Sequence, residues 1–108
     1  MLPVEVLRAW FAAHAAGDTA AARSLILEDA EILVPGGRLH GFDALMEWYR
    51  QRSATEPTFA YQVTELLSGE EFAAAVLTMR RGSEQWRQMV LYGIQGGLIC
   101  SIWAVEDR

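Results

Sequence analysis

The chain has 108 residues, of which 52% are hydrophobic and 21% are charged. This length suits one domain with a single core, and the composition is that of a globular rather than a disordered protein. A net charge of −5 provides no positive field for a phosphate backbone, so nucleic-acid binding is not expected. With Cys100 as its one cysteine, the chain can form neither an internal disulfide nor a cysteine-based zinc site.

The apolar stretches are shorter than the roughly 18 residues that a membrane-spanning helix needs. Near the N-terminus, the stretch MLPVEVLRAWF contains a proline and a glutamate where a signal peptide has basic residues and then an apolar run. The sequence therefore predicts a cytoplasmic protein with no membrane partner.

The first predicted helix begins at Pro3, because proline suits the first turn of a helix, and ends before Gly17. Apolar and aromatic side chains recur along it at three- and four-residue spacing, which is the pattern of one buried helical face. That face holds Val4, Leu7, Trp10, Phe11 and His14.

A second, shorter helix is predicted directly after the first. Asp18 or Thr19 can cap its N-terminus through a side-chain oxygen. We expect this helix to reach Leu27, with Leu25 and Ile26 on its buried side.

A short strand and a third helix complete the N-terminal half. Residues 30–34 predict the strand, which the following sequence PGG stops. The helical pattern then returns over residues 42–53. The side chains expected on the buried face of this helix are Leu45, Trp48, Tyr49 and Arg52.

The C-terminal half predicts four strands joined by hairpins. Alternating runs cover about 59–67, 72–81, 85–94 and 98–106. The sequences SGEE, RGSE and QGG separate them, and each is short enough for a tight turn. In the third run one side is apolar or aromatic, with Gln88 as the polar exception.

The last run is apolar on both sides, which a strand exposed on one face would not be. The three helices can cover one face of the sheet, and a second subunit is the expected cover for the other. The sequence therefore predicts a homodimer that associates through the outer face of the sheet.

The order of elements resembles the nuclear transport factor 2-like superfamily, which includes the SnoaL-like cyclases and ketosteroid isomerase. The resemblance is carried by AAGD after an aromatic helix, LEDAEI into the first strand, GGRLHG before the third helix, and GG before the final strand. It implies an α+β fold in which a cone-shaped, mostly antiparallel sheet wraps around three helices, as in a cystatin-like barrel. We expect residues 1–108 to form one such domain.

The resemblance to ketosteroid isomerase places three residues where that enzyme carries its proton chemistry. Val34 occupies the place of the general base, Trp10 that of a tyrosine donor, and Val90 that of a carboxylic-acid donor. Valine supplies no proton or donor, and indole supplies a donor but neither acid nor base. Isomerisation by that mechanism is therefore not expected. The Asp-Arg-Asp set of limonene-epoxide hydrolases is also not evident.

His14 and Tyr49 are the candidate catalytic residues. His14 shares the aromatic face of the first helix and can act as a general base or as a ligand-anchoring donor. The alternative is a last-turn histidine that is satisfied by helix carbonyls or water. Tyr49 matches a tyrosine that lines the pocket in the family. His40 is expected to pack its loop, and Glu106 is expected at a solvated terminus, although it could reach the cavity mouth.

The chain has many aromatic residues for its size, and they suit either a packed core or a cavity for a flat apolar molecule. The residues expected to bind such a ligand are Trp10, Val34, Trp48, Tyr61, Trp86, Val90, Tyr92 and Trp103. The protein would bind a small hydrophobic molecule and could isomerise, cyclise or hydrolyse it without a metal or cofactor. The alternative is a non-catalytic dimeric module that associates with partners or sequesters a ligand.

Overall fold

The computed structural model describes the backbone of residues 1–107 and the side chains of residues 1–105. Its elements are α1 (Pro3–Ala16), α2 (Thr19–Arg23), β1 (Ile26–Val34), β2 (Gly37–His40), α3 (Gly41–Thr55), β3 (Phe59–Ser68), β4 (Phe72–Arg81), β5 (Glu84–Gln95) and β6 (Leu98–Asp107). Within this part of the chain, no helix is long and apolar enough to cross a membrane.

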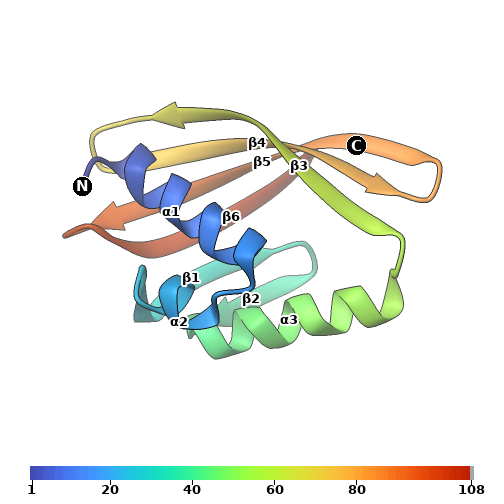
Figure 1. Ribbon diagram of the computed structural model, residues 1–108, viewed down its shortest axis with the longest axis horizontal. Coiled ribbons are helices and arrows are strands. Elements are labelled where there is room, and N and C mark those ends of the chain that lie inside the picture. Colours follow the sequence, from blue (N-terminus) through green and yellow to red (C-terminus); the bar gives the residue numbers. More distant parts are fainter. Residues whose placement is uncertain (108) are drawn as a thin grey trace.

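The strands form one curved, six-stranded sheet in the order β2-β1-β6-β5-β4-β3. Neighbouring strands are antiparallel except β1 and β6, which run parallel. The helices lie against the same side of this sheet, with α1 across its middle and α3 beside β1 and β2 (Figure 1). The predicted α+β architecture, with three helices packed into a mostly antiparallel sheet, is confirmed.

Helix α1 starts and ends as its sequence predicts. Pro3 occupies the first turn, and the Glu5 carboxylate accepts a hydrogen bond from the Leu2 backbone N–H at 2.9 Å. Gly17 ends the helix in the left-handed conformation, with φ of 67°. The side chains that α1 buries most deeply are Val6, Leu7, Trp10 and Ala13.

The predicted extent of the second helix is wrong. Asp18 caps α2 by accepting a hydrogen bond from the Ala21 N–H, but the helix ends at Arg23 and β1 already begins at Ile26. Ile26 pairs with Ile99 of β6, and the Ile99 N–H donates to the Leu25 carbonyl at 2.8 Å. Tertiary pairing with a distant strand therefore overrides the local helical pattern.

The sequence PGG is a hairpin turn rather than the end of extended structure. Val34 pairs with Gly37, and the chain returns as β2, which was not predicted. Gly41 then begins α3 with φ of 82°, and a Cβ at this position would lie 2.6 Å from the Glu28 carbonyl oxygen. Only glycine fits this junction without strain, so Gly41 fixes where α3 leaves the sheet.

The four C-terminal strands lie where the alternating runs predict them. One detail corrects the interpretation of the last run, because the register shifts between Ile94–Ile99 and Gly93–Ser101. Cys100 is the extra residue of this bulge, so Ile99 and Ile102 both face the core and both are buried. The bulge therefore accounts for Ile99 facing the core, whereas Trp103 and Val105 remain apolar side chains on the outer face.

Candidate functional site

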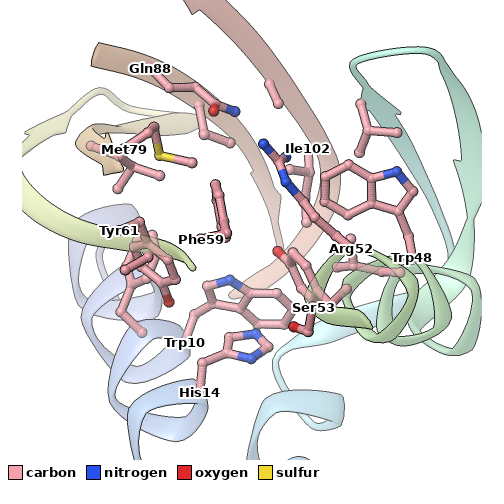
Figure 2. A pocket seen from close by; sticks show the side chains of 18 of the residues that line it. Trp10, His14, Trp48, Arg52, Ser53, Phe59, Tyr61, Met79, Gln88 and Ile102 are labelled. Carbon is pink, nitrogen blue, oxygen red and sulfur yellow. The ribbon is translucent and has the colours of Figure 1, made fainter. Parts of the chain in front are cut away.

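A cavity of about 410 Å³ lies between α1, α3 and the inner face of the sheet (Figure 2). Its volume is within the range of roughly 300–1,000 Å³ that is usual for small-molecule sites. The residues along its wall are Trp10, Phe11, His14, Val34, Leu45, Trp48, Tyr49, Arg52, Ser53, Phe59, Ala60, Tyr61, Leu77, Met79, Gln88, Val90, Tyr92, Ile102 and Ala104.

Most residues predicted from the sequence as catalytic or ligand-binding lie in this wall. They are His14, Tyr49, Trp10, Val34, Trp48, Tyr61, Val90 and Tyr92. The wall also includes residues that were not proposed as site residues, notably Arg52, Ser53, Met79 and Gln88. Gln88 was visible in the sequence as the polar exception on an apolar side, but that signal does not distinguish a cavity from a core.

Two predicted ligand-binding residues lie elsewhere. Trp103 is 51% exposed, because the bulge in β6 sets Ile102 and Ala104 toward the cavity and turns Trp103 to the outer face. Trp86 is buried, but it lies toward the β4–β5 turn, beyond the cavity wall, with the Arg81 guanidinium 5.5 Å from its ring centroid. These two residues therefore do not belong to the cavity.

The cavity opens between α3 and β3. Its exposed wall residues are Tyr49 and Ser53 on α3 and Ala60 and Tyr61 on β3. The floor is made by buried residues of the central strands, among them Val90, Tyr92 and Ile102. An incoming molecule would thus pass polar side chains at the mouth before it meets the apolar floor.

His14 lies beside Trp10 of its own helix (Figure 2). Its other ring contact is with Tyr49 of α3, whose ring centroid is 5.9 Å away. The Nε2 atom is buried and has no hydrogen-bond partner, so it is not satisfied by the carbonyls of the last helical turn. Desolvation lowers the pKa of His14 below its ordinary value. The imidazole is therefore neutral at pH 7 and can accept a proton.

Three tyrosines, Tyr49, Tyr61 and Tyr92, line the cavity. Burial raises the pKa of Tyr49, and its electrostatic interaction with Tyr61 raises it further, while Arg52 acts in the opposite direction. Burial likewise raises the pKa of Tyr61, and it raises that of Tyr92 well above the ordinary value. Tyr49 and Tyr61 are 38% and 46% exposed as whole residues, so both contribute to the rim of the cavity as well as to its wall. All three remain neutral hydrogen-bond donors at pH 7.

Gln88 is the one buried polar residue among the described side chains, with 5% of its surface exposed. It lies on β5 between the apolar partners Trp86 and Val90, on the inner face of the sheet. Its Oε1 atom is buried without a hydrogen-bond partner. A buried acceptor of this kind is costly unless a further donor reaches it.

Arg52 closes the wall on the side of α3. Its guanidinium carbon lies 4.1 Å from the Phe59 ring centroid and 5.2 Å from that of Trp48, so two aromatic rings hold it by cation–π contact. Its Nε donates to Glu56 at 3.2 Å, and Arg81 donates to the same carboxylate at 2.7 Å. The hydrogen bond from Arg81, and then that from Arg52, hold the pKa of Glu56 below its ordinary value.

The remaining candidates lie outside this site. His40 is exposed on β2 and lines a small groove on the outer face together with Glu31, Arg38 and Trp103. The side chain of Glu106 lies outside the described residues. Among the side chains that are described, no three histidine, cysteine, aspartate or glutamate residues come together as metal ligands would.

Comparison with known proteins places the chain within a family. The SnoaL-like domain profile matches residues 7–102, which is most of the chain. No protein with a curated function matches it in sequence.

Several solved structures share the fold at low sequence identity. A proposed ketosteroid isomerase from Kribbella flavida is 19% identical over 96% of this chain and 76% of its own, with a TM-score of 0.80. A proposed polyketide cyclase from Sinorhizobium meliloti is 17% identical over 94% of each chain, also with a TM-score of 0.80. TerC, co-crystallised with polyporic acid, is 14% identical over 97% of this chain and 90% of its own, with a TM-score of 0.83. The protein therefore belongs to the SnoaL-like domain family and has a nuclear transport factor 2-like fold, as the order of its elements predicted.

Proposed function

We propose that the protein binds a small, flat and mostly apolar molecule in the cavity between α1, α3 and the sheet. The observation that carries this proposal is the cavity itself, which is large enough for a ligand of a few rings and lined mainly by aromatic and aliphatic side chains. The ligand seen with TerC is consistent with a cavity of this kind.

Proton transfer on such a ligand would fall to His14, assisted by Tyr49. The neutral imidazole is the one group on the described wall that accepts a proton near neutral pH. Val34, at the place of the isomerase base, adds only apolar surface to the wall. Any isomerisation or cyclisation would therefore differ in its base from the ketosteroid isomerase reaction.

Two neighbouring residues of β6 provide a test of ligand binding. Ala104 faces the cavity, and Val105 is exposed on the other side of the sheet. In calorimetric titrations with 2-naphthol, Ala104→Phe should lower the affinity at least about tenfold by filling the cavity, and Val105→Phe should leave it unchanged. Absence of binding to the wild type, or an equal effect of both variants, would contradict the proposal.

The outer face of the sheet favours a second function, association between two copies of the chain. A row of apolar side chains crosses five strands in direct register, namely Leu33, Trp103, Leu91, Ala74 and Leu67. Met89 and Val105 extend it, and both are largely exposed in the single chain. An apolar surface of this extent is characteristic of an interface, and a homodimer with the two sheets face to face would cover it. The cavity opens on the opposite side, so dimerisation and ligand binding are compatible.

A further inference from the structure

The buried carboxamide of Gln88 has an unusual position for a glutamine. Its neighbours Trp86 and Val90 along β5 are apolar, as is its partner Leu77 on β4. On β6 its partner is Glu106, whose side chain lies outside the described residues. A residue that served only to fill this place would be leucine or methionine, which carry no buried polar atoms. The protein instead keeps an amide whose oxygen has no partner among the described residues.

The same carboxamide borders the cavity. Gln88 belongs to the cavity wall, and in the view of Figure 2 it lies on the side away from His14. The terminal torsion of glutamine is broad, so rotation about this bond can turn Oε1 into the cavity without moving the strand. An acceptor at the floor of an apolar site would then meet whatever donor a bound ligand presents there.

We infer that Gln88 is a specificity-determining residue that accepts a hydrogen bond from a hydroxyl group on the bound ring system. This inference rests on the proposed function, because it requires that the cavity binds a ligand. A site built around a buried acceptor discriminates against analogues that lack the donor, since the acceptor is then left desolvated and unpaired. The preferred ligands are therefore flat apolar molecules with a phenolic or enolic hydroxyl at the end that enters first.

A pair of probes separates the donor from the ring. Both 2-naphthol and 2-methoxynaphthalene have the same ring system and an oxygen acceptor, but only the naphthol carries a hydrogen-bond donor. Wild-type protein should bind 2-naphthol about tenfold more tightly in calorimetric titrations. Gln88→Met keeps the length of the side chain but removes the acceptor, so this variant should bind the two probes with about equal affinity. Gln62→Met, a change of an exposed glutamine on β3, should keep the wild-type preference.

Thermal melting separates recognition from a structural role. Replacing an unpaired buried amide by an apolar side chain of similar shape is neutral or stabilising, so Gln88→Met should melt at or above the wild-type temperature. A lower melting temperature with an unchanged preference for naphthol would overturn the inference. Equal binding of both probes by wild-type protein would overturn it as well, whether or not the variant folds, and would leave the proposed function standing. If wild-type protein binds neither probe, the proposed function fails together with the inference.

Discussion

The imidazole of His14 packs edge-on against the indole of Trp10, with 4.3 Å between the ring centroids. The two residues are four positions apart on α1, so they lie on the same face of the helix. Trp10 is almost completely buried and separates His14 from the core, whereas the other side of the imidazole meets Tyr49 across the cavity. This packing keeps the Nε2 atom of His14 away from water without giving it a hydrogen-bond partner.

The lowered pKa of His14 predicts that stability depends on pH. As the pH falls below about 6.5, the unfolded chain takes up a proton that the buried imidazole resists, so the free energy of unfolding decreases. The decrease ends once the pH has passed the lower pKa of the folded state. Melting temperatures measured between pH 5 and pH 8 should show this loss in wild-type protein and a smaller one in His14→Gln. If wild-type protein and His14→Gln lost the same stability, the lowered pKa of His14 could not be the cause. His40→Gln, a change of an exposed histidine, is the control.

Val34→Asp should destabilise the protein at neutral pH. Val34 is buried in the cavity wall, where a carboxylate would lose its hydration and its pKa would rise. The penalty should be smallest below about pH 4, where the carboxyl group is neutral in both states, and should grow as the pH rises through the higher folded pKa. We expect a loss of at least about 2 kcal/mol at pH 7.5 in urea titrations. Val34→Asn, which cannot ionise, should show no such dependence on pH, and a similar profile for both variants would argue against desolvation as the cause.

Gly41→Ala should lower the free energy of unfolding by roughly 1–3 kcal/mol. The positive φ of Gly41 is unfavourable for alanine, and the new Cβ would meet the Glu28 carbonyl oxygen at the start of α3. Gly37→Ala is the matched control, because Gly37 begins the strand that precedes Gly41, has no positive φ and has open space where a Cβ would lie. The free energies of unfolding are measured by denaturant titration. A similar decrease in the two variants would contradict a specific role for the positive φ and close contact of Gly41.

Trp103→Glu should convert a dimer into a monomer. Trp103 lies in the apolar row on the outer face, where a glutamate would bring a charge into the interface and lose hydration on association. Sedimentation velocity at micromolar concentration would measure the change, and a monomeric wild-type protein would refute association through this face. Leu2→Glu changes an exposed apolar residue at the start of α1, outside the row, and should remain a dimer.

Local periodicity was sufficient to predict α1, α3 and the four C-terminal strands. It could not predict β2 or the early start of β1, because both depend on pairing between segments that are far apart or on a turn within PGG. Ile26 has the same local pattern whether it ends a helix or begins a strand. Its contact with Ile99 decides between them.

The cavity was predictable where residue type and helical phase agree, as for Trp10, His14 and Tyr49. It was not predictable on β6, because the bulge at Cys100 shifts the phase of the strand and exchanges the faces on which its residues lie. Trp103 is therefore an outer residue despite its aromatic ring. Gln88 could be recognised in the sequence as a polar residue on an apolar strand face. That its buried oxygen lacks a hydrogen-bond partner is evident only from the structure.

The parallel pairing of β1 with β6 has a consequence for how the chain folds. The β1–β2 hairpin has no other neighbour in the sheet, so it can join β3, β4 and β5 only after the last strand has been synthesised. Contacts between segments so distant in sequence slow folding, because a long loop must close before they form. Until then, Val34 is separated from Val90 on the other half of the cavity wall. A nascent chain that lacks β6 would therefore hold two incomplete pieces of sheet and no binding site.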